Sequence, residues 1–570
     1  MLSSLSKVIL LTVVIALMAS SCQSDNKSSN KANENYLMKN RNKELCNEIK
    51  IVVLKKDISK EWGCEFSDPV LHFYQKREFL PFWSDTGKEK NYALSFINYL
   101  DTCEYDGIIK NDFSYSGIKS LWSNLVMDSL RQQHPKNWAK LDVLLTNALF
   151  NVCNDLKRGR LYADSLLWKY DTSKFSSFFD KMATDFAKSR NLNSFFISLQ
   201  PKLHDYKLLR NQIQSFVKNM DTTQYFLVDY SLLKKNETDS LAFYNSLFRR
   251  FYQESLIDSF HAFKTYPDSL LLSNTIKLWQ KKHGVNADGL LTFDLIKSVN
   301  LTDNYKYLQL MLTLDRYKKL SDSLGDYFII VNLPAYQLKF WDADTLAMYS
   351  KIICGKQSTP TPQLQSAVNE IITMPTWTVP PGIVKKEMLP QLKKNPGYLS
   401  KKGLSLYDNN GRKLNPGSID WSKYHSGIPY KITQRSGIRN ALGVIKFNFK
   451  NDHYVYLHDT NERSLFQRDK RCLSHGCVRV EKWMELANTI ARKDSILTGK
   501  SALMKYNSDS IANCIENKKN RRLEITHPIP LFISYFSVES INGQLVFHKD
   551  IYGDDEKLIR KYYSKWKLWN

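Results

Sequence analysis

The spacing of apolar residues changes near Tyr327, and this change restricts the fold more than any other feature of the chain. Upstream, the segment from about residue 57 to 250 reads mostly helical, and in residues 141–156 apolar side chains recur three and four positions apart. Downstream, runs such as 328–332 and 337–341 are typical of strands. The two patterns predict a multidomain α+β protein, in which a mostly helical domain at 57–250 precedes a β-rich domain.

The β-rich domain is expected at residues 325–505. Residues 349–354 and 446–457 add further strands, and the second of these runs holds two strands separated by a turn. An insertion at about 375–430 is rich in Pro, Gly, Lys and Tyr, and long irregular insertions often act as lids or binding loops. Residues 506–570 are expected to form a C-terminal extension that packs on the helical domain.

Length and charge limit the class of protein. The chain has 570 residues, which is too long for one domain and suggests roughly three or four. The composition excludes a collagen-like, low-complexity or wholly disordered chain. Lys and Arg number 81 against 57 Asp and Glu, a formal net charge of +24. This excess favours an acidic partner, and composition leaves open nucleic acid, an anionic membrane and a carboxylate-rich polymer.

The N-terminal residues predict export. An apolar run at 8–19 is too short to cross a bilayer of about 30 Å but suits the core of a signal peptide. Small residues then lead directly into Cys22, an order that resembles a bacterial lipoprotein signal; the alternative is an ordinary cleaved signal with an incidental cysteine. We expect a signal peptide at 1–21, a lipidated Cys22, a flexible tether at 22–56, and a periplasmic protein held by its lipid to the inner or outer membrane. Such a chain is expected to have no nucleic acid partner.

A compact segment at 251–302 follows the helical domain. Residues 274–285 predict an amphipathic helix that ends at Gly284, a turn follows at Asp288-Gly289, and another helix begins near Phe293. This order resembles the small three-helix peptidoglycan-binding module. His283 is expected to cap the helix or to lie on the surface, rather than to bind a ligand.

The chemistry is concentrated between residues 456 and 480. Cysteine attacks a carbonyl as its thiolate, so a catalytic cysteine needs a nearby His or positive field to lower its pKa. Cys477 follows Gly476, which allows a close approach of the backbone. A helix is expected directly after it, so Cys477 is predicted on a strand-to-helix turn, where the helix N-terminus supplies N–H donors to an oxyanion. His458 is expected at the end of the preceding strand and facing Cys477.

This arrangement resembles the YkuD-type L,D-transpeptidases, whose signature is a His followed by Ser-His-Gly-Cys. Ser474 begins that tetrad sixteen positions after His458. The resemblance implies Cys477 as nucleophile and His458 as its base. It also implies Ser474, His475 and Gly476 as a shaping turn, with an oxyanion hole formed by backbone amides near Gly476 and Cys477.

The resemblance extends over about residues 65–555 to the large Gram-negative L,D-transpeptidases, which have an N-terminal scaffold domain and a peptidoglycan-binding module. It implies that Arg479 binds a substrate carboxylate or holds the site, and that Asp459 orients His458, by its carbonyl rather than its side chain. In such enzymes the insertion is a capping loop. The substrate contacts implied by the resemblance are therefore Arg479, Tyr456, Asp459, Trp377 and Tyr398.

The implied reaction joins peptidoglycan stem peptides. Cys477 attacks a tetrapeptide donor after its third residue, D-Ala leaves, and the side-chain amine of a neighbouring stem takes the thioester to give a 3→3 cross-link. The thioester conserves the energy of the peptide bond, so neither a cofactor nor a metal is expected. The positive charge fits a carboxylate-rich wall polymer.

Three alternatives to a cross-linking enzyme remain open from the sequence. His458, Cys472, His475 and Cys477 are zinc ligand types in a compact pattern. The segment at 251–302 could carry the whole function in a non-catalytic wall-binding lipoprotein. The same cysteine could also pass the acyl group to water, as a carboxypeptidase or endopeptidase, or to a protein amine in wall anchoring. Cys472 could form a disulfide with Cys477, and packing as a small apolar side chain is the favoured interpretation.

Overall fold

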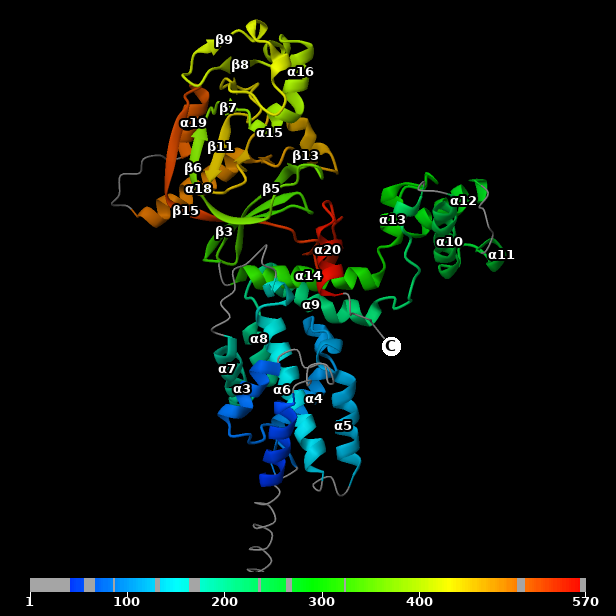
Figure 1. The fold of residues 1–570 in the computed structure, drawn as a ribbon. Coiled ribbons are helices and arrows are strands. Elements are labelled where there is room, and N and C mark those ends of the chain that lie inside the picture. Colours follow the sequence, from blue (N-terminus) through cyan, green and yellow to red (C-terminus); the bar gives the residue numbers. More distant parts are fainter. Residues whose placement is uncertain are drawn as a thin grey trace, which may run out of the picture. The chain divides into compact units, whose positions relative to one another are not determined.

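The computed structural model describes residues 42–55, 67–85, 88–128, 134–163, 175–233, 237–262, 269–321, 324–499 and 508–563 (Figure 1). Two compact units result, the first mainly from residues up to Lys319 and the second mainly from Leu320–Lys561. The first is helical and the second is rich in strands, which confirms the predicted multidomain α+β class. The predicted signal peptide, Cys22 and most of the predicted tether lie outside the described residues.

The prediction of a flexible tether at 22–56 is wrong over its last part, because residues 42–54 form a helix. The apolar side chains of this helix that are buried in the core of the first unit are Leu45, Ile49, Val52 and Val53. Their spacing places them on one face of the helix. Burial of that face stabilises ordered structure in a segment that the polar residues upstream had suggested to be flexible.

The first unit contains a long buried helix, α6 (Pro135–Lys157), in which every side chain from Leu141 to Leu156 is buried. The predicted helix at 141–156 is thereby confirmed and is longer at its N-terminal end. The other main helices of this region are α3 (Ser67–Lys76), α4 (Asn91–Leu100), α5 (Tyr115–Met127), α7 (Phe175–Lys188), α8 (Leu192–Leu199) and α9 (His204–Asn219). A helix buried on all sides must find internal partners for its polar side chains.

Asp142 is the main polar group in α6, and it is 1% exposed. The main-chain N–H groups of Phe82 and Trp83 donate to its two carboxylate oxygens at 2.9 Å each, and the Tyr74 hydroxyl donates to Oδ1 at 2.5 Å. Burial raises the pKa of Asp142, and these hydrogen bonds act in the opposite direction. The carboxylate thereby fixes the aromatic stretch 73–83 on α6.

The three-helix module is larger than predicted. Its helices are α10 (Glu237–Gln253), α12 (Ser269–Lys282) and α13 (Phe293–Val299), with a short α11 (Ser259–Ala262) between the first two. The boundary predicted between residues 250 and 251 is wrong, because Phe243, Leu247 and Phe251 of α10 share one core with Ile276 and Trp279 of α12. A helix that contributes three buried side chains to this core belongs to the module.

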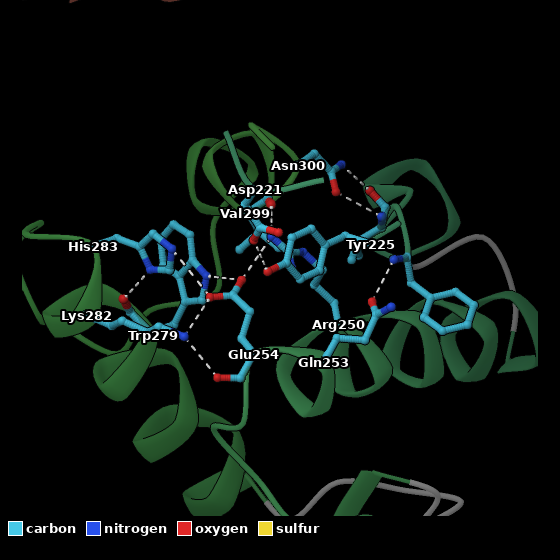
Figure 2. A network of polar contacts seen from close by, with 12 residues as sticks. Asp221, Tyr225, Arg250, Gln253, Glu254, Trp279, Lys282, His283, Val299 and Asn300 are labelled. Atoms are coloured by element: carbon cyan, nitrogen blue, oxygen red, sulfur yellow. Dashed lines mark hydrogen bonds and ion pairs between the residues drawn. The ribbon is translucent and has the colours of Figure 1, made fainter. Parts of the chain in front are cut away.

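Polar side chains fix the helix ends of the module (Figure 2), and another fixes its turn. The Trp279 indole N–H donates to Glu254 Oε1 at 3.0 Å, and Arg250 approaches the same oxygen at 2.9 Å. The His283 ring stacks on Trp279 with centroids 4.1 Å apart, and its Nδ1 bonds the Trp279 carbonyl at 2.9 Å. The prediction that His283 caps the helix is confirmed. The Gln280 side chain donates to the Asp288 carboxylate at 2.7 Å and accepts from the Gly289 amide at 2.8 Å. These two hydrogen bonds join the first helix of the predicted pattern to the Asp288-Gly289 turn.

One nine-stranded sheet forms the centre of the second unit, in the order β13-β5-β14-β12-β11-β6-β15-β3-β4, and β4 also pairs with β5, so the sheet closes on itself. Its strands are β3 (Tyr327–Asn332), β4 (Gln337–Asp342), β5 (Thr345–Gly355), β6 (Leu364–Thr373), β11 (Ile445–Phe449), β12 (Leu457–His458), β13 (Cys472–Ser474), β14 (Val478–Val480) and β15 (Arg521–Ser534). The strands predicted from alternation are all present.

The predicted end of the β-rich domain at residue 505 is wrong. Strand β15 lies between β6 and β3, pairing antiparallel with the first and parallel with the second. The C-terminal segment therefore completes the sheet before it continues through β16 (Val538–Ile541), β17 (Gln544–Phe547) and α20 (Asp554–Tyr562). Its last described residue, Tyr563, belongs to the first unit, where its hydroxyl donates to Asp315 at 2.8 Å. Apolar residues of β15 such as Leu531 and Ile533 are buried in the sheet's core, which explains the pairing.

The insertion is a small folded subdomain, which we call the cap and define as residues 377–434. Its four-stranded sheet has the order β7-β10-β8-β9, and its elements are β7 (Trp377–Thr378), α15 (Pro381–Ile383), a π-helical turn (Val384–Met388), α16 (Leu389–Lys394), α17 (Tyr398–Lys401), β8 (Leu404–Tyr407), β9 (Lys413–Leu414) and β10 (Lys431–Gln434). The cap has an apolar core of its own that includes Leu392, Leu406 and Trp421. It is consequently a structured element rather than an irregular loop.

No helix in the described ranges is long and apolar enough to cross a membrane.

Candidate active site

The two faces of the sheet differ in polarity around β12. His458 pairs with Lys446 of β11 and with Arg479 of β14. Because directly paired residues project from the same face of a sheet, these three side chains share one face. The alternate residues, Leu457, Phe447 and Val478, are fully buried in the apolar core. The alternation thus places the polar residues of three strands together, and His458 lies at the end of a strand as predicted.

Cys477 lies in a short turn between β13 and β14. The prediction of a strand-to-helix turn is wrong, since the next helix, α18 (Trp483–Thr498), begins only after β14. The amide of Val478 donates to the Tyr456 carbonyl at 3.1 Å, which sets Cys477 beside the start of β12. A helix dipole at this cysteine is therefore not part of the site.

Ser474 and Gly476 shape the turn, as the resemblance implied. The buried Ser474 hydroxyl donates to the carbonyl of Cys477 at 2.6 Å and accepts from the amide of Gly476 at 3.1 Å. Gly476 has φ of +120°, a backbone conformation that L side chains rarely adopt. Because its N–H is already bonded to Ser474, Gly476 is not an oxyanion donor in this state, which corrects half of the predicted oxyanion hole. The Cys477 amide donates to no acceptor within the described part of the chain.

A loop at 355–361 supports the same turn from behind. The Thr361 hydroxyl donates to the Gly476 carbonyl at 2.8 Å, and the Lys356 amide donates to the Ser474 carbonyl at 2.9 Å. Tyr552, from the C-terminal segment, donates its hydroxyl to the Gly355 carbonyl at 2.7 Å. Nothing in the local sequence marks Thr361 or Tyr552 for this role, since packing between distant segments brings them to the turn.

His458 is buried, 4% exposed, and its Nδ1 bonds the carbonyl oxygen of Asp459. The contact predicted for the Asp459 carbonyl is thus present. Burial, followed by the charge of Arg479, lowers the pKa of His458 to about 3. The imidazole is therefore neutral at physiological pH, and with the proton on Nδ1 its Nε2 is the nitrogen that can accept another.

The Asp459 carboxylate has a different task. It is 1% exposed, accepts the amide of Val444 at 3.1 Å, and forms an ion pair with Arg463 at 2.9 Å. Gly443 lies so close that a Cβ there would be 2.2 Å from Oδ2 of Asp459. The side chain therefore fixes the loop before β11.

The Cys477 thiol is half-buried and points toward the Tyr454 carbonyl, 3.9 Å from Sγ. Burial raises the pKa of this thiol, while hydrogen bonds with Tyr456 and the charges of Lys446 and Arg479 lower it. The Tyr456 ring also lies 5.6 Å from the His458 ring. No hydrogen bond among the described residues joins Cys477 directly to His458; Tyr456 contacts both.

The remaining predicted substrate contacts separate into three groups. Arg479 is paired with Glu462 at 2.6 Å, which favours the interpretation that it holds the site. Trp377 of the cap lies near Tyr456, whose pKa it lowers against the larger effect of burial. Tyr398 packs on the cap's own core and is not brought to the site.

The exposed His475 connects the turn to the cap. Its Nε2 lies 2.5 Å from Oε1 of Glu387, in the π-helical turn of the cap. Nothing in the sequence marks Glu387 as a partner of this turn, because it lies 88 residues away along the chain.

Cys472 is buried in the apolar core opposite Cys354 of β5, and the seven described cysteines are free thiols. Its packing as a small apolar side chain is thereby confirmed. Among the residues that the structure describes, no group of three or more His, Cys, Asp or Glu side chains could hold a metal ion. The zinc pattern does not converge, because Cys472 and Cys477 belong to different surroundings.

Residues 326–498 match the L,D-transpeptidase catalytic domain called YkuD, and residues 68–213 match a scaffold domain. A protein of Haemophilus influenzae, provisionally named an L,D-transpeptidase, is 34% identical over 230 residues, which are 40% of this chain and 45% of that relative. The chain thus spans a little under half the length of this curated relative.

Proposed function

For a chain that carries a YkuD L,D-transpeptidase catalytic domain and a scaffold domain, we propose that it forms 3→3 cross-links between peptidoglycan stem peptides through a thioester on Cys477. The observation that carries this proposal is that Cys477, in a turn tied by Ser474, precedes β14 on the face where Tyr456 and His458 lie beside each other. Such an arrangement suits acyl transfer by a cysteine nucleophile.

In the first half-reaction, Sγ of Cys477 attacks the carbonyl carbon of the third stem residue of a tetrapeptide, and the thiol proton passes to Nε2 of His458. The amide of Cys477 is available to the oxyanion. The C–N bond to D-Ala then breaks, and His458 returns the proton to the leaving amine. A thioester on Cys477 and free D-Ala result.

In the second half-reaction, the side-chain amine of a neighbouring stem attacks the thioester carbonyl and gives a proton to His458. The C–S bond breaks, and the Cys477 sulfur recovers the proton. One peptide bond is broken and one is formed, so the reaction is nearly balanced and uses no cofactor.

The neutral state of His458 is consistent with this scheme. An imidazole that is neutral at physiological pH can accept the thiol proton as the C–S bond forms, so no resting thiolate–imidazolium pair is needed. Trp377 and the pair His475–Glu387 bring the cap to the edge of the site. We infer that the cap covers the bound stem peptide and excludes water that would otherwise hydrolyse the thioester.

Three further parts of the proposal concern where the enzyme acts. Cys22 would carry a lipid that anchors the chain to the inner or outer membrane, with the enzyme in the periplasm. The module built from α10, α12 and α13 would bind peptidoglycan and raise the local concentration of stem peptides. The partners are then the peptidoglycan stems and a membrane.

The test is an assay with purified disaccharide-tetrapeptide, followed by liquid chromatography and mass spectrometry. The wild-type chain is expected to give a dimer that has lost one D-Ala. Cys477→Ala should give none, whereas Cys514→Ala, which removes a thiol in α19 (Ser508–Glu516), should behave as wild type. Tripeptide without dimer would replace cross-linking by carboxypeptidase activity. Unchanged substrate with all three proteins, together with retention on wall sacculi, would favour a binding protein.

A further inference from the structure

We propose that Lys446 supplies the positive charge that stabilises the Cys477 thiolate, an inference that deepens the proposed function and rests on it. Lys446 lies on β11, two strands from β14 and next to β12 in the sheet. Nothing in its local sequence distinguishes it from the other lysines of a basic chain, so the sheet register alone reveals it.

The geometry directs Lys446 to the reacting face. It is the direct partner of His458 in the β11–β12 pair, and so it projects from the face that carries His458 and Arg479. Its Nζ lies 4.0 Å from the centroid of the Tyr456 ring, and the Tyr456 carbonyl accepts the amide of Val478, the residue after Cys477, at 3.1 Å. The ammonium group therefore lies beside the residue that holds the Cys477 turn.

The other two basic residues on this face supply less positive charge to the sulfur. His458 is neutral because it is buried. Arg479 is bonded to Glu462 at 2.6 Å, which offsets its charge. Of the three basic residues that the register brings together, Lys446 therefore acts most strongly on the sulfur, and Arg479, paired with Glu462, acts on it less.

The acidic group nearest to Lys446 does not compete strongly. Glu370 of β6 accepts from Arg522 Nε at 2.7 Å and from Asn448 at 2.6 Å, so its charge is offset by Arg522. Burial lowers the pKa of Lys446, and the negative charges of Cys477 and Glu370 raise it again. Ammonium and thiolate thus stabilise each other in a partly buried place, where charges interact more strongly than in water.

The proposed thiolate is transient in the reaction, and the Lys446 charge stabilises it at two steps. The first is the transfer of the thiol proton to His458, and the second is the departure of the Cys477 sulfur from the tetrahedral intermediate. Lys446 touches neither the substrate nor the departing proton in this account.

The test measures the thiol itself, without the wall substrate. The rate of alkylation of Cys477 by iodoacetamide, an uncharged reagent, is followed from pH 6 to 10 by peptide mass mapping in the full chain. Lys446→Met should lower the rate at pH 7 by about tenfold, equivalent to about 1.4 kcal/mol, and shift the pH profile upward. Lys446→Arg, which keeps the charge, should recover most of the rate. Lys450→Met, which changes an exposed lysine just beyond the end of β11, should leave the profile unchanged.

Two outcomes would overturn the inference. One is an unchanged alkylation profile in Lys446→Met. The other is an equal loss in Lys446→Met and Lys446→Arg, because it would show that the side chain supports Tyr456 by packing rather than by charge. Circular dichroism of each variant checks that the sheet is intact. If the alkylation profile shifts as expected but the wild type makes no dimer, the role of Lys446 stands and the proposed cross-linking reaction fails.

Discussion

His458 illustrates how burial sets the chemistry of a single residue. Its side chain lies on the reacting face, yet it is almost inaccessible to water and bonded through Nδ1 to a main-chain carbonyl. Desolvation opposes its protonation, and the nearby Arg479 adds to the effect. The residue is thereby kept as a base with one defined tautomer, rather than as the permanent cation that a cysteine–histidine ion pair would require.

A dependence of stability on pH follows. The pKa of His458 is about 3 in the folded chain and about 6.5 when unfolded, so between these values the unfolded chain holds more protons. The free energy of unfolding should therefore fall as the pH is lowered through this window, by up to about 1.4 kcal/mol per pH unit. Hydrogen exchange of β11 and β12 at pH 7 and 5 should show wild type losing more protection than His458→Gln. Equal losses in both proteins would contradict the assignment.

Ser474 permits a second test at the same scale. Ser474→Ala removes the acceptor of the Gly476 amide and the donor to the Cys477 carbonyl. Leaving such groups unsatisfied costs about 1–3 kcal/mol, so we expect kcat to fall by roughly 5- to 150-fold with little change in KM. Ser474→Thr, which keeps the hydroxyl, should retain most of the activity in the same steady-state assay. A large rise in KM alone would instead make Ser474 a substrate ligand.

At the scale of the element, α10 shows that a helix can belong to a domain other than the one suggested by its place in the sequence. It follows the helices of the scaffold and has their composition, but its buried aromatic residues pack on α12 and α13. Glu254, just beyond its end, joins it to α12 through Trp279. Long-range packing, rather than the helix's own pattern, decides this membership.

Fragments of the module test the assignment. A fragment of residues 221–302 should be helical and unfold cooperatively, because it contains both sides of the apolar core. A fragment of 251–302 lacks Phe243 and Leu247 and should show weak helicity and a broad thermal transition. Circular dichroism compares the two, and a cooperative transition in the shorter fragment would restore the boundary read from the sequence.

At the scale of the whole molecule, the catalytic sheet is assembled from segments far apart in the chain. β15 enters it between β6 and β3, about 150 to 200 positions after them. Tyr552, from the same C-terminal segment, then supports the loop behind the Cys477 turn. The end of the chain is therefore part of the catalytic unit.

Deletion of the C-terminal segment should destroy that unit. A chain that ends at residue 505 leaves the inner edges of β6 and β3 unpaired and exposes their apolar core. We expect residues 325–499 of this chain to be digested rapidly in limited proteolysis, while the helices of the first unit persist. A chain that ends at residue 563 serves as the control, and equal resistance of the catalytic strands in both would contradict the role of β15.

The sequence by itself determined the fold class, the main strands and the group of residues that carries the proposed chemistry. The four residues His458, Ser474, Gly476 and Cys477 lie within twenty positions of one another. Because they are so close in the sequence, their pattern can be recognised without knowledge of the tertiary structure. The strands could be predicted because the alternation of apolar and polar residues is a local property of the sequence. The helix at 42–54 was also marked by spacing, but the polar stretch before it obscured the signal.

Only the tertiary structure decided which distant residues meet this group. Lys446, Thr361 and Glu387 reach it through strand register and loop packing, from positions 12, 115 and 88 residues away from the residues they pair with or contact. The helix expected after Cys477 was displaced by β14. The register of the strands is set by the burial of their apolar side chains on one face of the sheet. A shift of one residue would move every polar partner to the opposite face. That choice depends on the free energy of the whole sheet, which no local pattern contains.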